Sequence, residues 1–258
     1  MKIGLVLSGG GARGFAQLGV LKVLSDNNIK IDAITGCSIG ALIGACYAFD
    51  ENPEKIKKLL IDIKSKRNVY DYSFSTKSII KGNKLQEYIT EFFVTKEIKF
   101  EDLKITLSIN ATEIVNGQEI VLNTGLLIPA VMASLSYPGF FTIRKLEDRL
   151  CVDGGVVNPL PLDLLPAVDY AIIVDVSSEI IDIDEDSNMK DIILQSTLLM
   201  QKTIVDKSLN EYHGKYTIIR PDVSRIGVLQ FKNAENLIKI GEDAALKVID
   251  KIKEDLKE

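Results

Sequence analysis

The sequence predicts a three-layer α/β/α protein, in which helices cover both faces of a central, mostly parallel sheet. Three observations support this fold class. Short apolar runs that are typical of strands alternate with helical stretches. The first two strands each run into a glycine-containing turn and then into a helix. No repeat or Pro/Gly/Ser-rich linker divides the 258 residues. A chain of this length can bury a large core, so we expect a single domain over residues 1–258.

The first fifty residues predict a strand–helix–strand–helix unit. The run from Met1 to Leu7 is apolar and strand-like, and the stretch from Phe15 to Asn28 has apolar residues close to helical spacing. A second short strand is expected from Ile31 to Thr35. The stretch from Ile39 to Phe49 is small and apolar on nearly every side, which is typical of a fully buried helix. This order predicts a right-handed start to a parallel sheet.

The rest of the chain predicts further strands and two long helices. A charge-free run from Ile120 to Ile143 is long enough to cross a membrane. Pro129 and Pro138 interrupt it, so we expect a buried helix followed by a loop. Asn116-Gly117 indicates a hairpin turn. The expected strands run from Ile105 to Ile114, Gln118 to Leu122, Arg149 to Val152, Tyr170 to Ser177 and Tyr216 to Arg220, and the expected helices from Lys190 to Tyr212 and Ala234 to Leu256.

The charge composition argues against binding to nucleic acid and indicates one basic stretch whose role the sequence does not decide. A net charge of −5 argues against a nucleic-acid partner. Basic residues cluster from Lys55 to Lys84, where an amphipathic helix can dock on anionic membrane or simply present a solvated face. The stretch from Glu179 to Asn188 is acidic and is expected to form a solvated loop. The apolar start is too short for a signal peptide. We expect a soluble cytoplasmic protein that can bind peripherally to the membrane, of undetermined oligomeric state.

The first motif that carries chemistry is Gly36-Cys37-Ser38-Ile39-Gly40, a G-x-S-x-G between a short strand and a helix. This context is that of a nucleophile elbow, where a sharp turn exposes the serine hydroxyl. Glycines at Gly36 and Gly40 allow the strand and helix to pass closely. The helix directs its positive end toward a developing negative charge. The alternative is a glycine-rich turn in which Ser38 only caps the helix.

The second motif, from Gly9 to Gly14, follows the first strand and supplies exposed main-chain N–H groups suited to an oxyanion hole. It also fits the dinucleotide pattern G-x-G-x-x-G, which requires an acidic residue at the end of the second strand. Asp32 lies at the beginning of that strand, which argues against an oxidoreductase. Arg13 supplies a fixed charge for the loop or for a substrate phosphate. The oxyanion-hole candidates are Gly9, Gly10, Gly11, Arg13, Gly14 and Ile39.

The third motif, Asp153-Gly154-Gly155, follows a predicted strand and is weak alone. A serine triad requires an imidazole, and the only histidine is His213, which precedes Gly214 in a typical helix-terminus pattern. A neutral lysine would need deep desolvation. A carboxylate therefore remains as the base for Ser38, and Asp153 is the best-placed candidate. Cys37, Cys46 and Cys151 form no metal-binding spacing, so no metal site is expected.

These three motifs, in this order, resemble the signature blocks of patatin-like phospholipases. Ala133-Ser134 with Pro138 and Phe141, and Arg220-Pro221-Asp222, extend a likeness that spans nearly the whole chain and is closest to small bacterial members. The resemblance implies a nucleophilic Ser38, with Asp153 as proton acceptor and an oxyanion loop at Gly9–Gly11. It also implies hydrolysis of lipid acyl esters without calcium or a cofactor. Cys37 departs from the family pattern and would place an oxidation-sensitive thiol beside the site.

The sequence therefore predicts a serine lipid acyl hydrolase that cleaves phospholipid or lysophospholipid esters through an acyl-enzyme. Two alternatives remain: a Rossmann-type oxidoreductase that uses the loop from Gly9 to Gly14, and a lipid-binding regulator without turnover. Apolar residues between Leu126 and Phe141 are candidates for an acyl groove, although such residues more often belong to the core. These groove candidates are Met132, Leu135, Phe140 and Phe141.

Overall fold

A computed structural model describes residues 1–65, 71, 79–177, 183–224, 226–227 and 233–257. Within these residues an eight-stranded sheet has the order β5-β6-β3-β2-β1-β7-β8, and β4 pairs with β3. The five strands β3, β2, β1, β7 and β8 are parallel, whereas β4, β5 and β6 join antiparallel. The strands are β1 (Ile3–Leu7), β2 (Ala33–Gly36), β3 (Thr106–Glu113), β4 (Gln118–Leu122), β5 (Arg144–Leu146), β6 (Arg149–Asp153), β7 (Tyr170–Val174) and β8 (Tyr216–Ile219).

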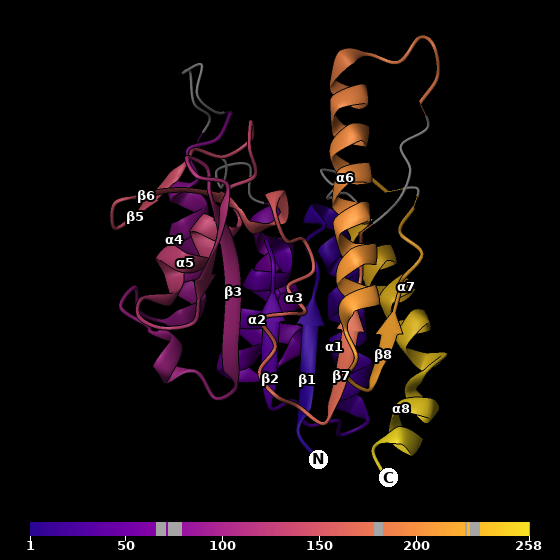
Figure 1. Ribbon diagram of the computed structural model, residues 1–258. Helices are drawn as coiled ribbons and strands as arrows, with labels where there is room; N and C mark the ends of the chain where they lie inside the picture. Colours follow the sequence, from indigo (N-terminus) through magenta and orange to yellow (C-terminus); the bar gives the residue numbers. More distant parts are fainter. Residues whose placement is uncertain (66–70, 72–78, 178–182, 225, 228–232, 258) are drawn as a thin grey trace.

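Helices cover both faces of this sheet (Figure 1), which confirms the three-layer class. The larger apolar core lies between one face and all the helices except α6, while α6 packs against the other face. The alternation along β1 shows the division, because Leu5 and Leu7 belong to the larger core and Val6 to the α6 side. The helices are α1 (Phe15–Asp26), α2 (Ile39–Asp50), α3 (Pro53–Ser65), α4 (Asn83–Phe93), α5 (Leu127–Ser134), α6 (Met189–Glu211), α7 (Ala234–Leu246) and α8 (Ile249–Asp255).

The antiparallel strands bring two distant segments together. Ile109 of β3 pairs with Gly36 of β2 on one side and with Leu122 of β4 on the other. Ala111 pairs with Ile120 of β4 and with Asp153 of β6. Because β4 occupies one edge of β3 throughout, β2 and β6 share the other edge. Their carboxyl ends therefore meet head-on along β3, about two residues or ~7 Å apart in register.

Most expected elements are present, with differences at their ends. The expected helix from Ala234 to Leu256 is broken into α7 and α8 around Val248, where the backbone leaves helical geometry. The strand from Tyr170 ends at Val174, three residues earlier than expected, because Asp175 and Ser177 form a side-chain turn. The charge-free run contains the last three residues of β4 and the buried helix α5, followed by a turn. Within the described residues, no helix combines the length and the apolar character that a membrane span requires.

The basic and acidic stretches fall partly outside the described residues. Of the basic stretch, Lys66, Arg67 and Lys77 lie outside them, as does the side chain of Lys64. α3 is amphipathic as expected, but its apolar face is packed into the core. The helix pattern is thus accounted for by the fold, and membrane contact stays a prediction. Residues 178–182 of the acidic stretch also lie outside the described part of the chain.

Candidate active site

Ser38 lies on a strained turn between β2 and α2. Its φ of 54° and ψ of −122° are unusual for a residue with a side chain. The turn needs glycine on both sides, because a Cβ at Gly36 would lie 2.5 Å from the carbonyl oxygen of Gly40, and one at Gly40 would overlap the carbonyl oxygen of Leu7. Ser38 is the residue before the first turn of α2, yet its hydroxyl caps no N–H of that helix. The geometry is that of a nucleophile elbow and not of a helix cap.

A buried serine from α5 fixes this turn. The Ser38 N–H donates to Ser134 Oγ at 2.9 Å, and Ser134 has no exposed surface. Its neighbour Ser136 accepts the Asp153 N–H at its carbonyl oxygen, at 2.9 Å. The end of α5 therefore holds the main chain of both Ser38 and Asp153, which relates their positions to each other.

Ser38 and Asp153 are in direct contact. The Ser38 hydroxyl donates to Asp153 Oδ2 at 2.5 Å, and Asp153 is 2% exposed. The second carboxylate oxygen, Oδ1, accepts the Gly155 N–H at 2.8 Å and faces the Cys37 thiol at 3.9 Å. Gly154 packs so closely that a Cβ there would overlap the Asn110 side chain. The three-residue motif thus turns sharply and directs the carboxylate at the serine.

Burial changes the acid–base behaviour of this pair. Loss of water around Asp153 raises its pKa from 3.8 to about 6, while hydrogen bonds from Ser38, Gly155 and Cys37 oppose the rise. A carboxylate with this pKa is a stronger base than ordinary aspartate and is still ionised at neutral pH. Its oxygen is within hydrogen-bond reach of the serine proton, as general-base chemistry requires.

The glycine loop lies against the elbow, but its members have different roles. A Cβ at Gly9 would lie 3.6 Å from the Ser38 Cβ. Against expectation, the Gly9 N–H is occupied, because it donates to the Pro159 carbonyl oxygen at 2.9 Å. Among the described residues no acceptor is found for the N–H groups of Gly10, Gly11 or Ile39. These three amides therefore remain candidates for oxyanion donors, while Gly14 makes room for the Ile39 side chain.

The Arg13 side chain is better placed to anchor the loop than to donate a hydrogen bond to an oxyanion. Its side chain is 1% exposed, and Nε donates to the Ile226 carbonyl oxygen at 2.6 Å. Burial lowers its pKa to about 10, so the guanidinium is still charged at neutral pH. Its Nη1 atom is buried and has no hydrogen-bond partner in the part of the chain that the structure describes. Both anchoring and contact with a substrate anion are therefore compatible with this position.

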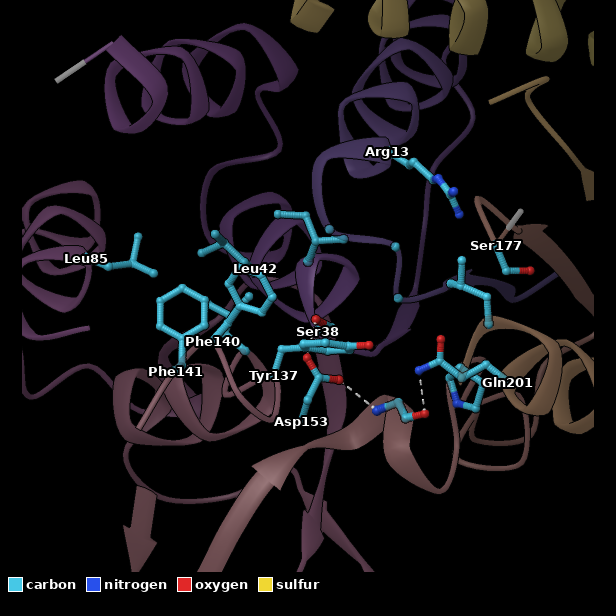
Figure 2. A pocket seen from close by; sticks show the side chains of 18 of the residues that line it. Arg13, Ser38, Leu42, Leu85, Tyr137, Phe140, Phe141, Asp153, Ser177 and Gln201 are labelled. Atoms are coloured by element: carbon cyan, nitrogen blue, oxygen red, sulfur yellow. Dashed lines mark hydrogen bonds between the residues drawn. The ribbon is translucent and has the colours of Figure 1, made fainter. Parts of the chain in front are cut away.

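A cavity of about 410 Å³ opens over the Ser38–Asp153 pair, a volume within the range of small-ligand sites. Figure 2 shows that apolar and polar side chains lie on opposite sides of Ser38: Leu42, Leu85, Phe140 and Phe141 on one side, and Arg13, Ser177 and Gln201 on the other. Three of the expected groove residues line the cavity. The fourth, Met132, is core instead.

The Cys37 thiol beside the site is less reactive than the sequence led us to expect. Cys37 is fully buried, and burial together with the nearby Asp153 charge raises its thiol pKa well above the ordinary value. Because thiolates are the reactive form, this environment opposes the expected oxidation sensitivity.

His213 follows α6 at the amino edge of the parallel sheet, before β8, whereas Ser38 follows the carboxyl end of β2. The strands hold them apart by a strand length, roughly 13 Å or more.

Several cavity residues carry no motif that indicates their role. Tyr137 lines the cavity, and burial followed by the Asp153 charge raises its pKa. Gln201 of α6 donates to the Gly155 carbonyl oxygen at 2.8 Å. Only the family resemblance points to Ser134. The position of Asp32 agrees with the sequence argument against a dinucleotide site, since its carboxylate accepts the Ile3 N–H at the amino edge of the sheet.

Fold and site together define a class of α/β protein in which a serine on a strand-to-helix elbow contacts a buried carboxylate and faces main-chain amides. A family model described as patatin-like phospholipase matches residues 5–166, which is more than half of the chain and includes both Ser38 and Asp153. The chain belongs to the patatin-like phospholipase family.

Similar proteins cover this chain to different extents. An uncharacterised NTE family protein of Mycobacterium bovis is 29% identical over 267 residues, which cover 94% of this chain and 46% of the relative. Lysophospholipase NTE1 of Scheffersomyces stipitis is 33% identical over 68% of this chain and 12% of its own length. Rat patatin-like phospholipase domain-containing protein 7 is 32% identical over 67% of this chain and 13% of its own length. The chain spans about half the length of the first of these relatives.

Solved structures agree on the fold. VipD from Legionella pneumophila has a TM-score of 0.57 at 13% identity, over 97% of this chain and 67% of that chain. The ExoU–SpcU complex of the Pseudomonas aeruginosa type III secretion system has a TM-score of 0.54 at 16% identity, over 100% of this chain and 52% of that chain. At such identities the likeness concerns the fold alone.

Proposed function

We propose that this protein is a serine lipid acyl hydrolase that cleaves carboxylic esters of phospholipids or lysophospholipids through an acyl-enzyme on Ser38. The observation that carries the proposal is the 2.5 Å hydrogen bond from the Ser38 hydroxyl to a buried Asp153 at the floor of a partly apolar cavity. Membership of the patatin-like phospholipase family and a relative named lysophospholipase support a lipid substrate.

The first step forms the acyl-enzyme. Asp153 Oδ2 accepts the hydroxyl proton as Ser38 Oγ attacks the ester carbonyl carbon. The carbonyl oxygen becomes an oxyanion, which accepts hydrogen bonds from the amides of Gly10, Gly11 and Ile39. Each such donor is worth about 10²–10³ in rate when it is preorganised. The bond from the carbonyl carbon to the alcohol oxygen then breaks, and Asp153 returns the proton to the departing alcohol.

The second step releases the fatty acid. Water enters the place of the alcohol and gives its proton to Asp153 as its oxygen attacks the acyl carbon. The same three amides hold the second oxyanion. The bond to Ser38 Oγ then breaks, and the proton on Asp153 returns to the serine. In this scheme Asp153 is the only group that carries the proton, so no imidazole is needed.

The two sides of the cavity indicate how the substrate lies. The acyl chain fits the apolar side formed by Leu42, Leu85 and the two phenylalanines, where its burial contributes about 0.8 kcal/mol per CH₂. The alcohol part then extends toward Arg13, Ser177 and Gln201. A cation on that side suits an alcohol that carries a phosphate, which favours phospholipid or lysophospholipid over a neutral ester.

The test combines labelling with turnover. A fluorophosphonate probe, which reacts with activated serines, should modify Ser38 alone, as located by peptide mass spectrometry. Ser38→Ala and Asp153→Asn should each abolish release of fatty acid from lysophosphatidylcholine and of p-nitrophenol from its acyl esters. His213→Gln is the matched control, because this exposed side chain lies at the opposite edge of the sheet.

Each readout can overturn the proposal. Labelling at another serine would place the nucleophile elsewhere, and unchanged turnover in a folded Asp153→Asn protein would remove the carboxylate from the chemistry. If His213→Gln abolished turnover while the protein stayed folded, an imidazole would be required. Probe labelling of Ser38 without hydrolysis of any lipid ester would favour the lipid-binding regulator instead.

A further inference from the structure

α6 has two apolar faces, although one would suffice to pack it on the sheet. Its inner face contributes Leu194 and Leu198 to the cavity and buries Val205. Five large apolar side chains on α6 are exposed instead, with exposed fractions between 47% and 73%. Ser196, which lies between them, and Thr203, which follows them on the same side of the helix, complete the outer stripe. Its large apolar members are Met189, Ile192, Ile193, Leu199 and Met200.

The outer stripe follows the spacing of a helix-pairing seam. Its members recur at intervals of three and four residues along α6, so they lie on one side of the helix, opposite the cavity side. No charged residue occurs from Ile192 to Gln201. In Figure 1 the amino-terminal half of α6 extends past the carboxyl edge of the sheet, so the stripe stands clear of the sheet layer. A heptad assignment puts Ser196 and Thr203 at a positions and Ile192 and Leu199 at d positions.

We propose that the outer stripe of α6 pairs antiparallel with the same stripe of a second copy of this chain. In an antiparallel seam, a positions of one helix meet d positions of the other. Ser196 then faces the Leu199 position of the second copy, and Thr203 faces its Ile192 position. Each small side chain receives a large one, which is how facing layers fill space without voids. Ile193 and Met200 meet beside this seam and widen it.

Charge favours the same direction of pairing. The turn before α6 carries Asp184, Glu185 and Asp186, all exposed, whereas the other end of α6 carries mixed charge, with Lys207 ion-paired to Glu211 at 3.8 Å. Antiparallel pairing keeps the two acidic turns apart and sets each beside the mixed-charge end of the other copy. Parallel pairing would bring the two acidic turns together and would place Leu199 against Leu199 and Ser196 against Ser196.

A lipid surface fits the outer stripe less well than a second copy. The stripe and the cavity lie on opposite sides of α6, so a membrane on the stripe would not face the cavity. Insertion by the protruding end would put three carboxylates first into the lipid, where charges are costly. The stripe is also interrupted by Ser196 and ends at Thr203, and these polar side chains match a partner helix better than continuous hydrocarbon. We therefore assign the second copy.

Pairing would also steady the cavity wall. The inner side of the same helix turns contributes Leu198 to the cavity and Gln201 to the Gly155 carbonyl oxygen. A second helix on the outer side would hold these turns against the site. This consequence rests on the proposed function, whereas the pairing itself does not and is tested without any substrate.

The test measures mass in solution and the register of pairing. Light scattering after size exclusion should show the full chain at twice its monomer mass, and Leu199→Glu should halve that mass, because a carboxylate would be buried in the seam. Leu246→Glu, which changes an exposed leucine on α7, is the matched control and should stay dimeric. Circular dichroism should show unchanged helix content in both variants.

Cross-linking fixes the direction of the two helices. A double Ile192→Cys/Thr203→Cys variant should form an intermolecular disulfide under mild oxidation, while Ile192→Cys alone should not. The native thiols give little background because all three are buried. A monomeric wild-type chain, a dimer that Leu199→Glu does not change, or efficient cross-linking of Ile192→Cys alone would overturn the proposal. Stripe-dependent binding of a monomer to phosphatidylcholine vesicles would assign the stripe to lipid instead.

Discussion

Asp153 should link catalysis and stability through a single ionisation. Its carboxylate is buried, and its pKa is raised from 3.8 to about 6. Because only the ionised form accepts the Ser38 proton, kcat/KM should fall on the acid side with a midpoint near 6. At one pH unit below that midpoint, about a tenth of the enzyme is ionised and the rate should be about tenfold below its plateau.

The same shift has a cost in stability. A raised pKa means that the folded state prefers the protonated carboxyl, so this group favours folding fully below pH 3.8 and loses that contribution as pH rises through about 6. The total change is about 3 kcal/mol, at 1.36 kcal/mol per unit. Between pH 4.5 and 7.5 the part within reach is about 2 kcal/mol. Asp153→Asn removes the titration.

Urea unfolding of wild type and Asp153→Asn across this range measures the effect. The free energy of unfolding of the variant should rise relative to wild type by about 2 kcal/mol as pH increases from 4.5 to 7.5. A limb near 6 is also close to ordinary histidine at about 6.5, so the limb must persist in His213→Gln. A limb near pH 4, or a stability difference that does not change with pH, would refute the reasoning.

Two further predictions concern packing around the site and the helices. Ser134→Ala removes the acceptor of the Ser38 N–H, and an unpaired buried amide costs about 1–3 kcal/mol. We therefore expect kcat to fall about tenfold or more with KM little changed. A tenfold rise in KM at unchanged kcat would contradict this. Gly241→Ala would drive a Cβ into the Ala16 carbonyl oxygen, so urea unfolding should show a loss of about 1–3 kcal/mol, whereas the exposed Leu246→Ala should change it little.

The elements nearest the chain start could be predicted from local pattern, because each strand leads into glycines, the first helix has an apolar repeat and the second is apolar on nearly every side. β1, β2, α1 and α2 agree with expectation to within a few residues. We did not predict α4, although it buries Leu85, Ile89 and Phe93 at helical spacing, because this apolar repeat is short and follows a strongly basic stretch. The break between α7 and α8 was also missed, since both halves carry helix-forming residues and no proline or glycine marks the boundary.

The sequence predicted which residues form the site, but not the tertiary contacts that hold them in place. The glycine motifs and the shortage of histidine led to Ser38 and Asp153, and the structure brings their side chains into contact. Strand-end reasoning did not foresee that β6 runs antiparallel. The role of Gly9 differed because its amide is used by Pro159, a contact between segments about 150 residues apart. Tyr137 and Gln201 reach the cavity through tertiary packing, which local patterns do not encode.

Because β2 and β6 meet head-on along β3, the length of β3 between them fixes the spacing of Ser38 and Asp153. More than a hundred residues of chain separate Ser38 from Asp153, but on β3 only Asn110 lies between the partner of Gly36, two residues before Ser38, and the partner of Asp153. Insertions in the connecting loops would leave that spacing intact, so the chain can grow there and reshape the cavity without separating the pair. One residue added within β3 would shift the register and send the carboxylate to the other face of the sheet.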